Sequence, residues 1–231
     1  MRATSGDVED LVFLLDVDNT LLDNDRITAD LHHFLEDEVG QERADAYFRI
    51  FEELREHLGY ADYLGALQEY RNEFPRDPHL LYLSHYLIDY AFANRLYPES
   101  LDVIDRLKQW GSVVILSDGD VVFQPRKIER SGLWAAVEGK VLIYVHKEQQ
   151  LHDVASRFPA RHYALVDDKL RILSAVKDEW AERVTTVFPQ QGHYAHDPKI
   201  LADYPPADIA VARIGELMHV DRTAFLKHEP C

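Results

Sequence analysis

In Leu11-Val12-Phe13-Leu14-Leu15-Asp16-Val17-Asp18-Asn19-Thr20, a continuous apolar run ends in two aspartates that stand two positions apart. A short, wholly apolar run of this kind is typical of a strand that is buried on both faces, as in a parallel sheet. Residues two apart on an extended chain point the same way, so Asp16 and Asp18 can face one cleft while Val17 packs away from it. The stretch therefore predicts a buried strand that ends in a pair of carboxylates.

The rest of the chain repeats this apolar pattern five times. The runs are residues 113–116, 141–145, 163–166, 184–188 and, more weakly, 208–211. Amphipathic stretches of helical length separate or follow the later runs, at residues 124–137, 148–158 and 170–180, with a last helix running through Met218. Alternation of strand and helix predicts an α/β fold: a Rossmann-like, three-layer core with a parallel sheet and helices on both faces.

Residues 26–97 break the alternation, because they show helical periodicity and no convincing strand. Helices are expected at residues 41–58, 63–74 and 80–94, with Pro75 and Pro78 interrupting them. The aromatic residues of this stretch are expected to pack in its core; they include Tyr82, Tyr86, Tyr90 and Phe92. The sequence thus predicts a core domain of residues 1–24 and 98–231 and an inserted all-helical domain of residues 25–97.

The charge and composition of the chain limit the kinds of molecule that it can bind. The net charge of -16 over 231 residues disfavours nonspecific binding of nucleic acid and of acidic membranes, since no basic patch offsets it. The single cysteine, Cys231, excludes an internal disulfide and a thiolate metal site. The apolar run at residues 11–15 is too short to span a membrane. We expect a cytoplasmic monomer or homodimer that binds neither nucleic acid nor membrane.

Polar residues follow four of the apolar runs, and the carboxyl ends of parallel strands meet at one edge of a sheet. These residues are Asp16 and Asp18, then Ser117, then Lys147, then Asp167 and Asp168. Four converging carboxylates repel each other unless a cation lies among them, and hard oxygen ligands suit Mg²⁺. One aspartate can attack phosphorus while the other moves protons, with Ser117 and Lys147 binding phosphoryl oxygens.

The order Leu-Leu-Asp16-Val-Asp18-Asn-Thr20-Leu-Leu, Ile-Leu-Ser117-Asp-Gly, His-Lys147-Glu and Leu-Val-Asp167-Asp168 resembles the four motifs of the haloacid dehalogenase superfamily. The resemblance covers nearly the whole chain, and the helical insertion is similar to that superfamily's cap. It implies that Asp16 forms an aspartyl-phosphate and that Asp18 is the general acid and base. It also implies a metal site and a substrate-binding set. The metal ligands would be Asp16, Asp168, the backbone carbonyl of Asp18 and, directly or through water, Asp167; the substrate would contact Asp18, Asn19, Ser117, Asp118 and Lys147.

The expected activity is Mg²⁺-dependent hydrolysis of a small phosphorylated metabolite. The resemblance makes dehalogenation improbable, because that chemistry dispenses with an acid/base aspartate at the position of Asp18. Phosphonatase chemistry needs a lysine from the cap, and residues 21–100 contain none. A phosphomutase or phosphotransferase on the same core remains an alternative, as does a noncatalytic phosphate-binding regulatory protein.

Several assignments compete with plainer interpretations. Ser117 could merely cap a helix, and Asp167 with Asp168 could be a helix N-cap pair. Lys127 competes with Lys147 for the phosphoryl group; we favour Lys147 because it directly follows a strand, and we expect Lys127 to face solvent or the sheet edge, so that its removal costs little. Lys147 is followed by Glu148 where many relatives carry proline.

Residues at the rim of the expected cleft are harder to assign. His193 and His196 follow the fifth run and could bind substrate, although solvated loop histidines are commoner and a two-histidine metal site lacks a third ligand. The arginines of the insertion could contact substrate or be ordinary surface charges. They are Arg26, Arg43, Arg49, Arg55, Arg71 and Arg95, of which Arg26 is slightly favoured because it follows the nucleophile most closely.

Overall fold

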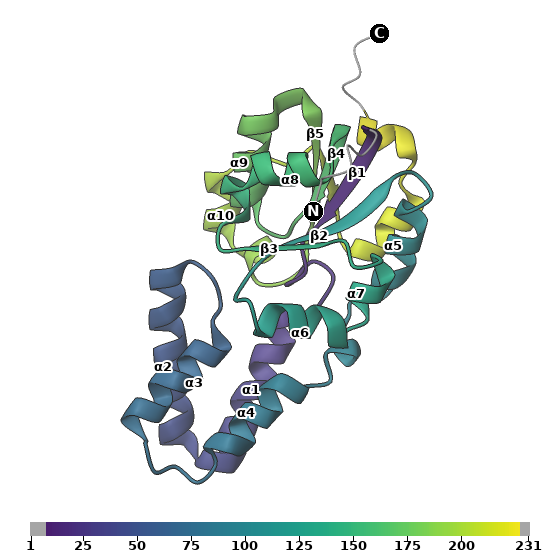
Figure 1. The fold of residues 1–231 in the computed structure, drawn as a ribbon. Helices are drawn as coiled ribbons and strands as arrows, with labels where there is room; N and C mark the ends of the chain where they lie inside the picture. Colours follow the sequence, from purple (N-terminus) through teal and green to yellow (C-terminus); the bar gives the residue numbers. More distant parts are fainter. Residues whose placement is uncertain (1–7, 227–231) are drawn as a thin grey trace.

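The computed structural model describes residues 8–226, and its centre is a six-stranded, wholly parallel sheet in the order β3-β2-β1-β4-β5-β6 (Figure 1). The strands are β1 (Glu9–Leu15), β2 (Ser112–Asp118), β3 (Val141–Tyr144), β4 (Ala160–Val166), β5 (Val184–Pro189) and β6 (Ile209–Val211). Each of the six apolar runs coincides with one of them, so the predicted α/β fold is confirmed. Cys231 lies outside the described residues.

β1 is the central strand, and the chain reverses its direction of travel across the sheet there. Leu15 is in register with Ile115 of β2 on one side and with Val166 of β4 on the other. In open parallel sheets such a reversal leaves a crevice beyond the carboxyl ends of the strands on either side of it. The residues that follow β1, β2 and β4 therefore meet in one place.

Alternate residues of β1 point to opposite faces of the sheet, and because these residues are apolar, helices cover both faces. Phe13 belongs to a buried cluster with Ile104 of α5, whereas Leu14 belongs to a second cluster with Leu173 of α9. The core helices are α5 (Ser100–Leu107), α6 (Phe123–Arg130), α7 (Leu133–Ala136), α8 (Leu151–Arg157), α9 (Leu170–Trp180) and α10 (Pro198–Asp203). Figure 1 shows α8 and α9 on one side of the sheet and α5 on the other, which gives the expected three layers.

Two predicted core helices are interrupted. The helix expected over residues 124–137 ends at Arg130 and resumes as α7 at Leu133, because Gly132 between them has a φ of +88° in the left-handed region. The stretch expected at 148–158 divides into a 3₁₀ turn, η2 (Lys147–Gln149), and α8. The helix expected to run through Met218 is also a 3₁₀ helix, η5 (Ile214–His219), and another, η6 (Arg222–Leu226), follows it.

Between β1 and α5 the chain forms a separate group of helices, here called the helical lobe. Its elements are α1 (Asn24–Val39), α2 (Gln41–Leu58), α3 (Tyr63–Glu73), α4 (Leu80–Asp89) and η1 (Phe92–Arg95). Figure 1 shows them gathered below the sheet, next to α6. None of the helices within residues 8–226 is long and apolar enough to cross a membrane.

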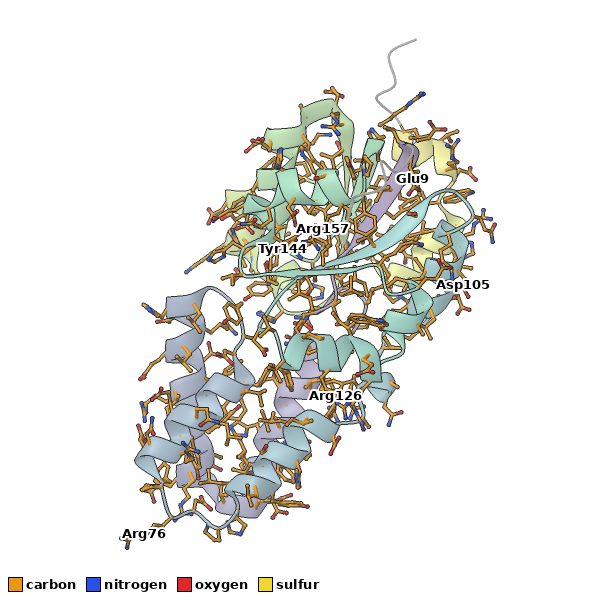
Figure 2. All side chains as sticks on the ribbon, viewed as in Figure 1. Glu9, Arg76, Asp105, Arg126, Tyr144 and Arg157 are labelled. Atoms are coloured by element: carbon orange, nitrogen blue, oxygen red, sulfur yellow. The ribbon has the colours of Figure 1, made fainter. Side chains whose placement is uncertain are left out.

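Two segments of chain connect the lobe to the core, and they run side by side. The N–H of Asp23 donates to the carbonyl of Arg95 at 2.7 Å, and that of Tyr97 donates to Leu21 at 2.9 Å. Farther along the border, Arg126 of α6 forms an ion pair with Asp89 at the end of α4 at 3.3 Å; Figure 2 labels Arg126 there. The expected domain boundaries at residues 24/25 and 97/98 lie next to these two connecting segments.

Aromatic side chains fill much of the lobe's interior. Phe92 is fully buried, Tyr90 is partly buried, and the ring of Tyr86 stacks on that of Phe34 with centroids 3.7 Å apart. Tyr82 was expected in this core, but 52% of its surface is exposed. The prediction fails there because Tyr82 lies on the exposed side of α4, where its ring is tilted against that of Phe34 with centroids 5.3 Å apart.

Candidate active site

Three aspartates meet beyond the carboxyl ends of β1 and β4. The N–H of Asp16 donates to Val166 at 2.9 Å and the N–H of Asp167 donates to Val187 at 3.1 Å, so the sheet ladder continues through both residues. Asp16, Asp167 and Asp168 are nearly or wholly buried, and one carboxylate oxygen from each lies within 4.8 Å of the others. The sequence predicted this convergence from the position of the residues alone.

Lys147 is buried between two of these aspartates, as its place after β3 predicted. Its Nζ lies 2.5 Å from Asp16 Oδ1, 2.6 Å from Asp167 Oδ2 and 3.2 Å from the carbonyl of Leu116. Its backbone N–H donates to Asp118 Oδ1 at 2.7 Å, which fixes the start of η2. Burial alone would lower the pKa of Lys147, but Asp16 and Asp167 outweigh it and raise the pKa, so the side chain is a permanent cation.

Lys147 and the neighbouring Lys169 supply two positive charges, which do not balance the three carboxylates. Burial raises the pKa of Asp168 well above its usual value, and it raises that of Asp167 to about 6 although Lys147 opposes it. Neither carboxylate oxygen of Asp168 has a hydrogen-bond partner among the described residues; only its backbone N–H is bound, to Thr20 Oγ1 at 3.0 Å. Burying a carboxylate without hydrogen-bond partners costs folding free energy, and its oxygens are suitable ligands for a hard divalent cation.

Asp18 belongs to a different group of contacts. Its Oδ1 accepts from Lys127 Nζ at 2.7 Å and its Oδ2 from Gln124 Nε2 at 3.4 Å. Lys127 also donates to Asn24 Oδ1 at 3.1 Å, and Gln124 donates to Ser117 Oγ at 2.9 Å. Val17, between the two aspartates, is fully buried in the core, as the alternation of side chains predicted.

The expectation that Lys127 faces solvent or the sheet edge is wrong. Only 1% of its side chain is exposed, and its ammonium lies 5.4 Å from the ring centre of Phe123 and 5.9 Å from that of Tyr63. The error came from judging Lys127 by its distance along the chain from Ser117. The spacing held a better signal, because Gln124 and Lys127 are three apart and therefore share one face of α6.

The two capping alternatives are not what the structure shows. The N–H groups of Val122 and Phe123, where α6 begins, donate to Asp120 Oδ1 at 2.8 and 2.7 Å, so Ser117 caps nothing. At α9 the N-cap residue is Lys169, and no side chain accepts a capping hydrogen bond there. Asp167 accepts one bond from the N–H of Lys169, at 2.8 Å.

Asn19 and His193 bind the junction between core and lobe. Asn19 has a φ of +59°; its Oδ1 accepts from the N–H groups of Asn24 and Asp25, and its Nδ2 donates to Asp25 Oδ1 at 2.9 Å. His193 Nδ1 lies 2.7 Å from the same oxygen of Asp25. A Cβ on Gly192 would come within 2.6 Å of Asn19 Cβ, so glycine is required for this approach. The amide of Asn19 is thus occupied locally, although Asn19 also lines the cleft described next.

A cleft of about 80 Å³, here called the reactive cleft, opens between core and lobe. The core contributes Asp18, Asn19, Asp118, Asp168, Lys169, His193 and Tyr194, and the lobe contributes Asn24, Arg55, Gly59, Tyr60 and Ala61. His193 is therefore at the rim as predicted, whereas His196 is exposed and does not line the cleft. Burial raises the pKa of Asp118, although Lys147 opposes the shift.

Of the six candidate arginines, Arg55 lines the reactive cleft. The preference for Arg26 is not supported, because its side chain is 60% exposed and pairs with Asp30 one turn along α1. Other candidates are engaged within the lobe: Arg43 pairs with Asp77, and Arg95 also pairs with Asp30. Position along the helices, not closeness to Asp16 in sequence, brings Arg55 to the site.

A family model described as haloacid dehalogenase-like hydrolase matches residues 11–178. The chain is also similar to a protein of known structure from Burkholderia xenovorans LB400 that is described as a haloacid dehalogenase-like hydrolase. The two chains are 60% identical, the match covers 92% of this chain and 99% of the other, and the TM-score is 0.89. No curated protein matches the chain.

Two more distant structures share the fold. YfnB of Bacillus subtilis, solved with bound magnesium, is 16% identical, covers 91% of this chain and 98% of its own, and has a TM-score of 0.59. The L-2-haloacid dehalogenase of Xanthobacter autotrophicus is also 16% identical, with coverage of 90% and 96% and a TM-score of 0.60. At this level of identity the likeness concerns the fold and leaves the reaction open.

Proposed function

The chain belongs to the haloacid dehalogenase-like hydrolase family, and we propose that within it the protein is a Mg²⁺-dependent phosphohydrolase acting on a small phosphate monoester. One observation carries the proposal. Asp168 presents two buried, unpartnered oxygens beside Asp16, while Asp18 is held apart from them by Lys127 and Gln124. A cation site and a separate proton-transferring carboxylate are what hydrolysis of a phosphate ester needs.

The residues present fit a bound Mg²⁺. Asp16 and Asp168 would hold it, with the backbone carbonyl of Asp18 and, directly or through water, Asp167 completing the set. When bound, the ion neutralises charge on the phosphoryl oxygens and orients them for attack. The chain's own cation, Lys147, already holds the Asp16 carboxylate in place and adds a fixed positive charge for the same oxygens.

The reaction proposed for these residues has two steps. In the first, Asp16 attacks phosphorus, a new Asp16–phosphorus bond forms, the bond from phosphorus to the ester oxygen breaks, and Asp18 gives a proton to the leaving oxygen. In the second, Asp18 takes a proton from water, the water oxygen attacks phosphorus, and inorganic phosphate leaves Asp16 free again. Ser117 and Lys147 bind the phosphoryl oxygens in both steps, and the lobe acts as a cap that limits water.

Asp18 favours this reaction over dehalogenation on physical grounds. A halide leaves as a stable anion and needs no proton, whereas an alkoxide leaving group does. A carboxylate positioned by a buried lysine and a glutamine is not needed for the departure of a halide, whereas the departure of an alkoxide depends on such a proton donor. The fold shared with the Xanthobacter dehalogenase does not oppose this, because that likeness extends to the fold alone.

Hydrolysis of para-nitrophenyl phosphate tests the proposal, measured with Mg²⁺ and with EDTA for the wild type, Asp16→Asn and the surface control Asp178→Asn. Turnover is expected for the wild type and the control with Mg²⁺, and not for Asp16→Asn or in EDTA. A panel of phosphorylated metabolites and 2-chloropropionate extends the assay. Release of chloride without release of phosphate would replace the proposed activity with dehalogenation, and phosphoryl transfer that requires a bisphosphate activator would replace it with a mutase.

A further inference from the structure

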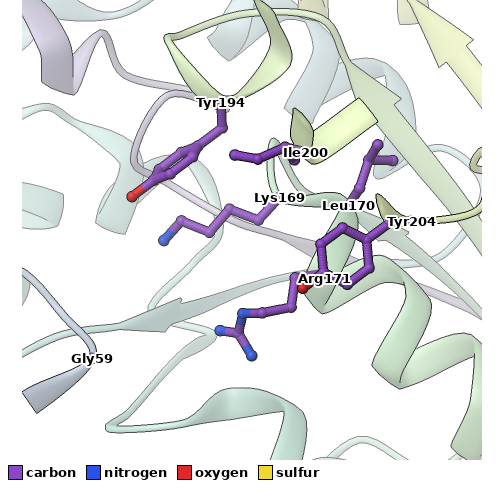
Figure 3. Close-up of a pocket in the computed structure, with 7 residues that line it drawn as sticks. All are labelled: Gly59, Lys169, Leu170, Arg171, Tyr194, Ile200 and Tyr204. Atoms are coloured by element: carbon purple, nitrogen blue, oxygen red, sulfur yellow. The ribbon is translucent and has the colours of Figure 1, made fainter. Parts of the chain in front are cut away.

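Beside the reactive cleft lies a second cavity, of about 210 Å³, here called the lateral pocket. Figure 3 shows its polar wall: Lys169 after β4, Arg171 on α9, and Tyr194 and Tyr204 from the segments after β5, with Gly59 of the lobe on the opposite side. Two aliphatic side chains complete it. Its volume is below the roughly 300–1,000 Å³ of typical small-molecule pockets, so it suits one small group and not a whole cofactor.

The lateral pocket and the reactive cleft adjoin. Gly59, Lys169 and Tyr194 line both of them. Lys169 directly follows Asp168, which also lines the reactive cleft, so a residue shared by the two cavities lies next to the proposed metal site. A molecule with a phosphoryl group at Asp16 can therefore extend past Lys169 into the lateral pocket.

The charge of the lateral pocket is opposite to that of the protein. Two cations and no carboxylate line it, in a chain with 41 acidic residues and a net charge of -16. Arg171 forms an ion pair with Glu148, which does not line the pocket, at 2.7 Å through Nη1. No other hydrogen bond of its guanidinium is found among residues 8–226, so its remaining donors can bind a ligand. A concave site of this sign attracts anions even in an acidic protein.

Lys169 is the cation that both cavities share. Among residues 8–226 no carboxylate forms an ion pair with it, and its ammonium lies 5.5 Å from the ring centre of Tyr194. Its ammonium is therefore available to an anion in either cavity.

We propose that the lateral pocket binds a second anionic group of the substrate through Lys169 and Arg171. The preferred substrates are then phosphate monoesters whose leaving group carries a carboxylate or a second phosphate a few bonds from the ester oxygen. Tyr194 and Tyr204 supply neutral donors and close the pocket around this group. The inference rests on the proposed phosphohydrolase function and specifies its substrate class.

Matched substrates test the inference, because each pair differs only in the second anion. The first pair is 3-phosphoglycerate and glycerol 3-phosphate; the second is propane-1,3-diol bisphosphate and 3-hydroxypropyl phosphate. For each pair the ratio of kcat/KM values is measured. Charge-assisted contacts of this kind predict a ratio on the order of 10 to 100 in at least one pair. Preference in the first pair alone identifies a carboxylate, in the second alone a phosphate; a ratio near one in both overturns the inference.

Variants locate the preference. Arg171→Met and Lys169→Met are each expected to lower the ratio about tenfold, and Arg171→Lys to retain part of it. The matched control is Arg157→Met, which removes an arginine that pairs with Asp153 on α8 outside the pocket, and it should keep the wild-type ratio. Arg171 is the sharper probe, because Lys169 also adjoins the metal site. An unchanged ratio in both pocket variants contradicts the assignment.

A binding measurement separates this inference from the proposed function. Absence of turnover on every phosphate ester would defeat the proposed hydrolysis, so Asp16→Asn is titrated calorimetrically with 3-phosphoglycerate and with glycerol 3-phosphate. Tighter binding of the first compound, lost in Asp16→Asn/Arg171→Met, supports the pocket even without turnover. If 3-phosphoglycerate turns over but binds no better than glycerol 3-phosphate, the hydrolase stands and the lateral pocket does not.

Discussion

The protein buries two lysines beside its reactive cleft, and their surroundings differ. Lys147 pairs with both Asp16 and Asp167, and the carboxylate of Asp168 lies beside these two. Lys127 lies beside a single carboxylate, that of Asp18, and also donates to a neutral amide oxygen. We call the first set the Lys147 group and the second the Lys127 group.

The two groups differ in charge balance and in how fully their polar atoms are hydrogen-bonded. The Lys127 group is balanced in charge, and every one of its polar atoms named above has a partner within the chain. The Lys147 group has an excess of negative charge, and neither carboxylate oxygen of Asp168 finds a hydrogen-bond partner in the part of the chain that the structure describes. Buried polar groups are almost always satisfied, so an imbalance of this kind supports the cation and phosphoryl sites proposed for these residues. The balanced group, in contrast, holds one residue, Asp18, in position.

The largest loss of activity is expected when Asp18, the carboxylate of the Lys127 group, is replaced. Asp18→Asn removes the proton donor and acceptor while keeping the shape, and should lower kcat on an alkyl phosphate by on the order of 10³-fold. The loss should be smaller on para-nitrophenyl phosphate, whose leaving group needs less protonation. Steady-state kinetics on the two esters measure this difference. Equal losses on both would show that Asp18 does not protonate the leaving group.

Lys147→Ala should be the next most damaging change. It removes the cation that holds Asp16 and faces the phosphoryl oxygens, so we expect a loss on the order of 10²-fold in kcat/KM. Circular dichroism must show a native fold for the comparison to count. A variant that folds and keeps most of its activity would mean that the imbalance of the Lys147 group has no catalytic role.

Lys127→Ala should have a smaller effect, on the order of tenfold, because Lys127 positions Asp18 without touching the phosphoryl group. The loss should again be greater for alkyl phosphates than for para-nitrophenyl phosphate, which a merely structural defect would not produce. Lys140→Ala is the control, since it removes a surface lysine paired only with Glu138. A larger loss for Lys127→Ala than for Lys147→Ala would reverse the roles given to the two groups.

The smallest effect concerns stability. Without metal, the raised pKa values of Asp167 and Asp168 mean that the folded protein binds more protons than the unfolded chain between about pH 5 and pH 7. The free energy of unfolding should therefore fall as pH rises through this window. We expect a Tm in EDTA lower at about pH 7 than at about pH 5, by roughly 2–4 °C for each kcal/mol lost.

Mg²⁺ should reverse this loss at neutral pH, because it binds the ionised carboxylates. Asp168→Asn should weaken both the pH dependence and the effect of Mg²⁺, whereas Lys127→Ala should preserve them. Differential scanning calorimetry gives the Tm of each protein at both pH values, with Mg²⁺ and with EDTA. A metal-free protein that is equally stable at both pH values would contradict the electrostatic account of the Lys147 group.

The sequence predicted the sheet and the Lys147 group because both depend on local patterns. The wholly apolar run before Asp16 is typical of a strand buried on two faces, and parallel strands bring their carboxyl ends together regardless of how the helices pack. The position of Lys147 directly after a strand was therefore enough to place it beside Asp16. The same reasoning placed Asp167 and Asp168.

The Lys127 group escaped prediction because it depends on how a helix is rotated. The spacing of Gln124 and Lys127 indicates that they share one face of α6, but whether that face is exposed or buried beside Asp18 is decided by the packing of α6 between the sheet and the lobe. The contribution of Arg55 is of the same kind, since it depends on how the lobe meets the core. Patterns of one strand or helix predict residues at strand ends well and residues between packed helices poorly.

Covalent phosphorylation of Asp16 is the most direct test of the account. Asp18→Asn is mixed with substrate and Mg²⁺, quenched in acid and digested, and the peptide that contains Asp16 is weighed by mass spectrometry. We predict that this peptide gains the mass of one phosphoryl group, and that the gain is absent in Asp16→Asn and in EDTA. Phosphate on another residue, or turnover by the wild type with Asp16 unmodified throughout, would contradict it.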